Sequence, residues 1–389
     1  MKIPSIIWKL SIATMLLNIS FLMVYSVSTI YFYEVLGLTA ASIGIISGIS
    51  ESLSYFIKFI SGALSDKYSN RITFVKFGIL GVFISRIGFA IFQTPVGATI
   101  SRVVERISNG IQAAPCDAWI GDKVERKDIG AAYGLRRGLS MLGAFLGVIM
   151  AIYFLKLSTF QYLFLAASIP AIIAFFIINS EKKSEEININ HKNKKEIGNV
   201  LNTIKNIQKK AWLVIITGGL LSLVRTMEIF FPIYALKEIS MEKEYVPIIY
   251  LISYGFYSIF AYPAGKLCDK KPPYIVYILS TFLICIFLII FSYTSNCITF
   301  FIAISIWGIY LAVNQTLFSY LIAKITSNNE RGTAFGIYHT ISAVTMLIGG
   351  ATLGNIVDSG DYLKICIILL SFIFFVGLFV ILQFKKIKI

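Results

Sequence analysis

Twelve apolar runs, each about as long as a membrane is thick, constrain this chain more than any other feature. A spanning helix needs about 20 apolar residues. Hydrophobic residues make up 57% of the 389 residues and charged residues only 14%, which is more apolar surface than a soluble core of this length can bury. The predicted class is therefore an all-α membrane protein. The expected spans are 7–33, 41–65, 73–93, 96–121, 131–155, 160–179, 211–236, 246–268, 274–294, 298–323, 332–357 and 362–384.

The runs form two sets of six, separated by a polar stretch rich in lysine, asparagine and glutamate. We expect an N-terminal six-helix bundle at 1–180 and a C-terminal six-helix bundle at 211–389. The polar stretch at 181–210, which holds His191, is expected to be a cytoplasmic linker.

Two short motifs recur in the two halves at nearly the same offset, which indicates an internal duplication. Gly62-Ala-Leu-Ser-Asp-Lys returns as Gly265-Lys-Leu-Cys-Asp-Lys. In each copy a glycine lies near the end of an apolar run, an aspartate follows four residues later, and cations follow the aspartate. In the same way, Arg126-Lys-Asp-Ile-Gly in the first half corresponds to Glu330-Arg-Gly in the second half. The two halves are therefore expected to share one fold.

Basic residues gather at alternate joints between the expected spans, and this predicts the orientation. If both termini are cytoplasmic, the outer joints hold only Lys156, Lys237, Lys243 and Lys364. This asymmetry follows the positive-inside rule and accounts for most of the net charge of +15 without nucleic-acid binding. We expect an integral protein of a plasma or bacterial inner membrane with both termini in the cytoplasm.

Several ionisable residues lie inside the expected spans, where each costs about 2.5 to 3.5 kcal/mol on insertion scales and requires a partner or an aqueous cavity. Arg86 lies well inside the third span. Arginines match or outnumber glutamates in the set, which favours an anionic or polar solute. The candidates for substrate binding or coupling are Glu51, Arg102, Glu105, Arg106, Arg225 and Glu228, with the polar residues Asn18 and Asn314.

Two interpretations of these charges remain open. They line a central cavity that binds a solute, or they form structural ion pairs, Glu105 with Arg102 or Arg106 and Arg225 with Glu228. A buried carboxylate can also have its proton affinity raised by desolvation. The buried glutamates are therefore candidates for proton coupling.

Motifs of catalysis and metal binding are absent from the sequence. The chain has no Walker-type phosphate loop, no G-x-S-x-G elbow and no H-E-x-x-H helix. Its five cysteines are scattered, and it has only two histidines. We expect no enzymatic activity, no cofactor and no metal site.

The joint between the second and third spans carries a charged motif of the form G-x-L-[AS]-D-[RK]-x-G-R-[RK]. Ser69 and Asn70 depart from this pattern. With the twelve spans and the basic linker, the chain resembles the major facilitator superfamily of secondary transporters. The matching residues are Gly62, Leu64, Ser65, Asp66, Lys67 and Arg71.

This resemblance implies two pseudo-symmetric six-helix bundles that move a small solute by alternating access, as a monomer in the lipid bilayer. Asp66 and Asp269 are expected to face the starts of the eleventh and fifth helices and to lock the cytoplasmic side, since an anion stabilises a helix N-terminus. The expected gate residues are Gly62, Asp66, Lys67, Arg71, Gly265, Asp269, Arg126 and Arg331.

Two further stretches resemble family motifs. Arg102 to Gly110 resembles a motif of the fourth helix, and Gly143 to Gly147 resembles an antiporter motif that lacks its usual proline. The resemblance implies a proton-coupled exporter. The alternatives are a facilitative or proton-symport importer of a polar or anionic metabolite, and a transport-inactive scaffold or sensor that keeps the fold.

Overall fold

The computed structural model describes residues 4–68, 70–123, 129–157, 159–180, 207–326 and 331–386, and the regular elements among them are helices. The first half contains α1 (Ser5–Ile30) with a π-helical turn (Tyr31–Val35), α2 (Ala40–Lys67), α3 (Arg71–Ile91), α4 (Pro95–Lys123), α5 (Ile129–Leu157) and α6 (Phe160–Asn179). The second half contains α8 (Lys209–Arg225), α9 (Phe231–Lys237), α10 (Ile248–Lys270), α11 (Pro273–Ser292), α12 (Cys297–Ile325), α13 (Arg331–Asp358) and α14 (Tyr362–Lys386), with 3-10 turns at Thr226–Ile229 and Lys243–Tyr245.

The prediction of an all-α membrane protein is confirmed. With α8 and α9 taken together, the long helical segments of the described residues lie within a few residues of the twelve expected spans. Ten of these segments are long and apolar enough to cross a membrane. The segment α4 is not among the ten, because Arg102, Glu105 and Arg106 interrupt its apolar residues. In α14 the described apolar stretch, Tyr362–Gly377, is shorter.

The seventh expected span, 211–236, is not one continuous helix. The segment α8 ends at Arg225, a 3-10 turn follows at Thr226–Ile229, and α9 begins with a proline in its first turn. Proline has no N–H to donate, so it suits the first turn of a helix, where that N–H would have no partner within the helix. The break places Glu228 on the 3-10 turn.

Contacts between residues divide the chain into two compact units. Unit 1 contains Met1–Leu38, Ile49–Lys194 and Lys243–Pro247, and unit 2 contains Thr39–Gly48, Lys195–Glu242 and Ile248–Ile389. Helix α2 is thus shared: its first residues belong to unit 2 and the rest to unit 1. The expected boundaries at 1–180, 181–210 and 211–389 stay predictions, and residues 181–206 lie outside the described part.

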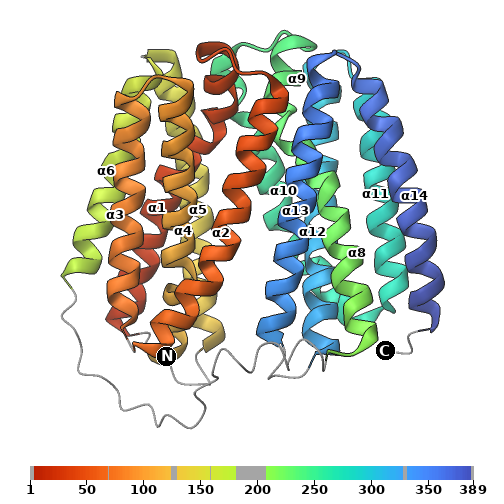
Figure 1. The fold of residues 1–389 in the computed structure, drawn as a ribbon, viewed down its shortest axis with the longest axis horizontal. Helices are drawn as coiled ribbons and strands as arrows, with labels where there is room; N and C mark the ends of the chain where they lie inside the picture. Colours follow the sequence, from red (N-terminus) through yellow and green to blue (C-terminus); the bar gives the residue numbers. More distant parts are fainter. Residues whose placement is uncertain are drawn as a thin grey trace. The chain divides into compact units, whose positions relative to one another are not determined.

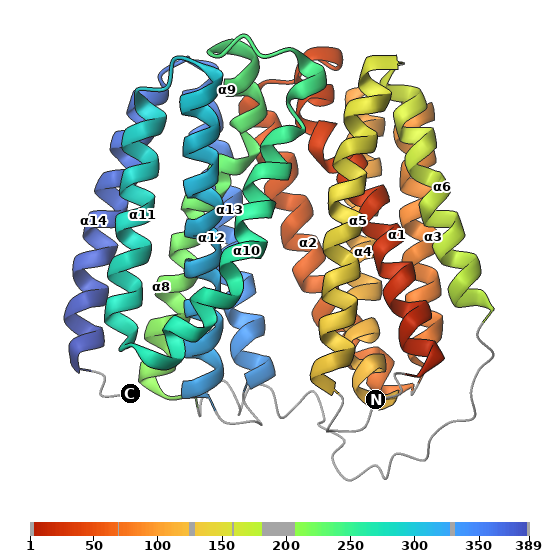
Figure 2. The same cartoon turned by 180° about the vertical axis from the view of Figure 1, so that it is seen from behind.

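Each unit is built from long helices that lie side by side (Figures 1 and 2). In unit 1, α1 packs against α5 and α6, and α3 packs against α4 and α6. In unit 2, α12 packs against α10 and α11, and α8 packs against α13. Small residues allow the close approaches: a Cβ on Gly78 of α3 would lie 2.8 Å from the Ser108 carbonyl oxygen of α4.

Within unit 2, the end of α13 caps the start of α2. The Asp358 carboxylate accepts hydrogen bonds from the backbone N–H of Ala40 at 2.7 Å and of Ala41 at 3.0 Å. The first N–H groups of a helix have no partner within the helix. A negative charge also stabilises the positive end of the helix dipole. Asp358 therefore holds the first turn of α2.

We expect Asp358→Asn to lower the free energy of unfolding by about 0.5 to 1 kcal/mol, since the amide keeps an acceptor but loses the charge. Thermal unfolding of the purified protein measures the effect. The control is Glu238→Gln, an exposed carboxylate just after the C-terminal end of α9, which is expected to leave the melting temperature unchanged or to raise it slightly. Equal melting temperatures for Asp358→Asn and the wild type would contradict the capping role.

Candidate functional site

A buried ion cluster joins α3 and α4 inside unit 1. Glu105 is 1% exposed, and its Oε2 lies 3.3 Å from Arg86 Nη1 and 3.1 Å from Arg102 Nη1. Its Oε1 accepts a hydrogen bond from Arg86 Nη2 at 3.3 Å. The Nε of Arg86, in turn, donates to Ser20 Oγ of α1 at 3.0 Å. One carboxylate therefore lies between two guanidinium groups.

A second ion pair extends the cluster to α2 and α1. Arg106 Nη2 lies 3.0 Å from Glu51 Oε1. The Arg106 guanidinium also lies over the rings of Phe21 at 4.8 Å and Tyr25 at 5.4 Å, and Arg102 lies 5.1 Å from the Tyr25 ring centroid. Such cation–π contacts are stronger when they are shielded from water. The guanidiniums of α4 are therefore held by carboxylates and by aromatic rings of α1.

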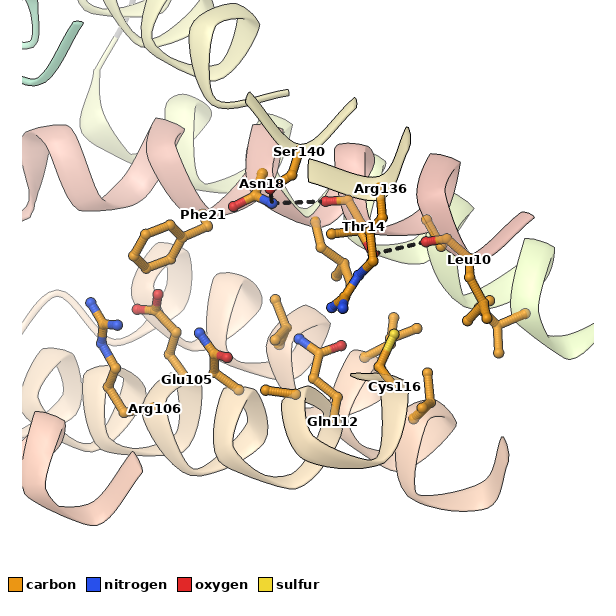
Figure 3. A pocket seen from close by; sticks show the side chains of 18 of the residues that line it. Leu10, Thr14, Asn18, Phe21, Glu105, Arg106, Gln112, Cys116, Arg136 and Ser140 are labelled. Atoms are coloured by element: carbon orange, nitrogen blue, oxygen red, sulfur yellow. Dashed lines mark hydrogen bonds between the residues drawn. The ribbon is translucent and has the colours of Figure 1, made fainter. Parts of the chain in front are cut away.

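A cavity of about 290 Å³ lies beside this cluster, between α1, α3, α4, α5 and α6 (Figure 3). Leucine, valine, isoleucine and alanine side chains and the ring of Phe21 form its apolar part. Its charged lining residues are Arg86, Glu105, Arg106 and Arg136, and its uncharged polar lining residues are Thr14, Asn18, Asn109, Gln112 and Ser140. The lining thus carries three guanidiniums against one carboxylate.

Arg136, on α5, was not among the residues predicted from the sequence. Its Nε donates to Thr14 Oγ1 at 3.2 Å, and its Nη1 pairs with the Asp117 carboxylate. The sequence does show a charged residue at this place in the apolar run 131–155, but it does not show the partners of Arg136 on other helices. Residues four apart, such as Arg136 and Ser140, share one face of a helix, and Ser140 accepts a hydrogen bond from the predicted candidate Asn18 at 2.6 Å.

The predicted residues of the second half lie in unit 2. Glu228 is 6% exposed, and its Oε1 accepts a hydrogen bond from the Tyr254 hydroxyl at 2.6 Å. Arg225 ends α8, one turn before Glu228. Asn314 on α12 donates to Ser280 Oγ of α11 at 3.2 Å, so this amide joins two helices.

Comparison with known proteins decides the family. The model of the Major Facilitator Superfamily matches residues 10–350. The chain belongs to this superfamily. The resemblance seen in the sequence is thereby confirmed, and the chain is an integral membrane protein of a transporter family and not an enzyme.

Two relatives and two solved structures illustrate the similarity. An uncharacterised MFS-type transporter of Methanocaldococcus jannaschii is 27% identical over 319 residues, which cover 79% of this chain and 77% of the relative. The multidrug resistance protein MdtH of Blochmanniella pennsylvanica is 26% identical over 171 residues, or 43% of this chain and 40% of that protein. The nucleoside transporter NupG has a similar fold with a TM-score of 0.83 and 13% identity, covering 98% of this chain and 100% of that one. A POT family transporter in complex with 5-aminolevulinic acid gives a TM-score of 0.82 and 14% identity, with 99% and 97% covered.

The gate that the superfamily resemblance implies is only partly within the described residues. Arg126 lies outside them, and so do the side chains of Asp66, Lys67 and Arg331. Gly62 lies on α2, and Gly265 and the exposed Asp269 lie on α10. Arg71 Nη1 donates to Ser65 Oγ at 2.9 Å and so links the start of α3 to the end of α2. The gate itself stays a prediction.

Asn70 occupies a position that is arginine in the gate motif, and in the structure it caps the N-terminus of α3. Its Oδ1 accepts from the Thr73 hydroxyl at 2.8 Å and from the Thr73 N–H at 3.4 Å. Asparagine is among the preferred residues at this position before a helix. The departure from the motif therefore replaces a cation with an N-cap of α3.

The two glycines that resemble the antiporter motif pack α5 against α1. A Cβ on Gly143 would lie 2.2 Å from the Met15 carbonyl oxygen, and one on Gly147 would lie 2.6 Å from the Ile19 carbonyl oxygen. Only a residue without a side chain allows backbones to approach this closely. Helix packing is thus sufficient to explain both glycines.

Proposed function

We propose that this superfamily member is a secondary active transporter that moves a small anionic or polar solute by alternating access between two six-helix bundles. The observation that carries the proposal is the cavity in unit 1, with three arginines and one glutamate in its lining. Buried charge in a membrane protein is costly and marks a solute pathway more often than it marks packing. The positive surplus favours an anionic partner.

We further propose that protons drive transport and that Glu228 carries the coupling proton. Its burial and its hydrogen bond with the Tyr254 hydroxyl support this role, since buried carboxylates inside membrane helices often serve as proton carriers. Glu105 is less suited, because two guanidiniums hold its carboxylate. The 3-10 turn that carries Glu228 resembles the interrupted helices at the midplane sites of other transporters.

Export is the proposed direction, with the solute exchanged for protons. The partial likeness to a multidrug resistance protein supports this direction, whereas Gly143 and Gly147 add little because packing explains them. The proposal includes a monomer in a plasma or bacterial inner membrane with both termini in the cytoplasm. It also includes the six-helix bundles at 1–180 and 211–389 and the linker between them.

Transport by the purified full-length protein in proteoliposomes tests the proposal. For an antiporter, labelled small carboxylates and phosphate esters are expected to accumulate when the lumen is acidic, because protons leaving the lumen drive the solute inward. Accumulation with an acidic exterior would instead establish proton symport and import. Absence of flux for every compound, with folded protein in the vesicles, would favour the transport-inactive scaffold.

Glu228→Gln is expected to abolish accumulation driven by the pH gradient, since glutamine cannot exchange a proton. The variant keeps an oxygen that can accept the Tyr254 hydroxyl, so it is expected to fold and to reach the wild-type level in the vesicles. The control is Glu242→Gln, an exposed carboxylate of the same unit. Gradient-driven accumulation by Glu228→Gln at the wild-type rate would show that Glu228 is not the coupling residue.

A further inference from the structure

Arg136 enters the cavity from α5, on the opposite side from the ion cluster of α3 and α4. In Figure 3 its guanidinium extends into the cavity toward Gln112, whereas Arg106 lies at the other end beside Phe21. We propose that Arg136 receives the anionic group of the transported solute and that this group is a carboxylate or a phosphate. This inference rests on the proposed function. It specifies the substrate as an anionic solute and names the residue that binds the anionic group.

The charges around the cavity leave a positive surplus on its lining. Glu105 is shared by Arg86 and Arg102, Arg106 pairs with Glu51, and Arg136 pairs with Asp117. These four arginines face three carboxylates, so the cluster as a whole carries a surplus of one positive charge. A low-dielectric surrounding makes such a surplus unfavourable until an anion enters. The cavity is therefore electrostatically suited to an anion.

The arginines of the lining differ in exposure and in how tightly they are held. The Arg86 side chain is 0% exposed and is bonded to Glu105 and Ser20. The Arg106 side chain is 7% exposed and lies against two aromatic rings. The Arg136 side chain is 17% exposed. Of the three, Arg136 is the most exposed.

The partner of Arg136 is more exposed than the guanidinium that it pairs with. The Asp117 side chain is 58% exposed and the Arg136 side chain 17%, so water competes with Arg136 for the Asp117 carboxylate. The guanidinium is nevertheless well oriented, because its Nε donates to Thr14 Oγ1, which itself donates to the Leu10 carbonyl at 2.8 Å. A planar guanidinium held in this way matches the two oxygens of a carboxylate or phosphate.

The rest of the cavity limits the size and polarity of the solute. A volume of about 290 Å³ is just below the usual range of ligand pockets, about 300 to 1,000 Å³. The Gln112, Asn109 and Asn18 amides of the lining suit hydroxyl, amide or carbonyl groups on the solute. The predicted solute is therefore a small polar metabolite with one anionic group at the Arg136 end.

Thermal unfolding of the purified full-length protein tests this assignment. The probes are small monocarboxylates, dicarboxylates and phosphate esters, each compared with its amide or alcohol analogue. At least one anion is expected to raise the melting temperature of the wild type, while its neutral analogue does not. Arg136→Gln is expected to lose this rise.

Arg137→Gln is the matched control, because it removes the same charge from the adjacent, exposed position of α5. It is expected to keep the anion-dependent rise. Arg136→Lys keeps the charge but loses the planar fork, and it is expected to bind the anion at least about tenfold more weakly than the wild type. If Arg136→Gln does not fold, this lysine variant decides the question.

Three results would overturn the assignment: equal stabilisation of the wild type and the Arg136 variants by an anion, equal stabilisation by the neutral analogue, or no stabilisation of the wild type by any anion. Flux measurements separate this failure from failure of the proposed function. Transport of a neutral or cationic solute without anion binding would leave the transporter standing and remove the anion subsite. Arg136-dependent anion binding without flux would support the anion subsite and count against the transporter.

Discussion

Replacing Glu105 with glutamine is expected to destabilise the protein by about 3 to 5 kcal/mol, the usual penalty for breaking a buried ion pair by removing one partner. The carboxylate lies within 3.3 Å of both Arg86 and Arg102, and the Arg86 side chain is 0% exposed. Glutamine can still accept hydrogen bonds but carries no charge. Two buried guanidiniums would then share a site without a counter-ion.

Glu51→Gln is the matched comparison, since it removes one carboxylate from the same cluster at a less buried position. The Glu51 side chain is 23% exposed, so water can partly compensate Arg106 when the carboxylate is lost. We expect the loss of stability to be several-fold smaller than for Glu105→Gln. The folded fraction after heating, measured by size-exclusion chromatography, reports the difference. Similar melting curves for the two variants would show that Glu105 does not neutralise the arginines.

The helices were predictable because the sequence carries their signals locally. The length of each apolar run and the polar joints between runs predicted helices at 41–65 and 274–294. The structure has α2 at Ala40–Lys67 and α11 at Pro273–Ser292. The break after α8 could not be read from its proline. Pro232 lies inside the expected span 211–236, but Pro115, Pro170 and Pro263 also lie inside expected spans, and these form the continuous helices α4, α6 and α10.

The candidate site was predictable only in part, because its contacts join residues from different helices. The pair Arg102 and Glu105 could be read from one helix, since residues three apart share a face. The part taken by Arg86 of α3 and Arg136 of α5 depends on how the helices rotate and pack within unit 1, and a single sequence does not encode that in any local pattern. The same is true of the Tyr254 partner of Glu228.

Gly143→Ala is expected to destabilise the protein by about 1 to 3 kcal/mol, the usual cost of overpacking. The added Cβ would lie 2.2 Å from the Met15 carbonyl oxygen and 2.9 Å from its carbonyl carbon. Both atoms belong to the backbone of α1, so no side-chain rotation can relieve the contact. Helices α1 and α5 must move apart to accommodate the Cβ, which weakens their packing within unit 1.

Gly138→Ala is the matched control, because it makes the same change on the same helix at a position where the added Cβ meets nothing within 4 Å. Alanine favours a helix over glycine by about 1 kcal/mol, so this variant is expected to be unchanged or more stable. The two substitutions thus have opposite predicted signs. Transport per folded molecule should stay near the wild-type value in Gly143→Ala if the glycine serves packing alone. A variant that is fully stable but inactive would instead show that the antiporter-like motif acts in the transport cycle itself.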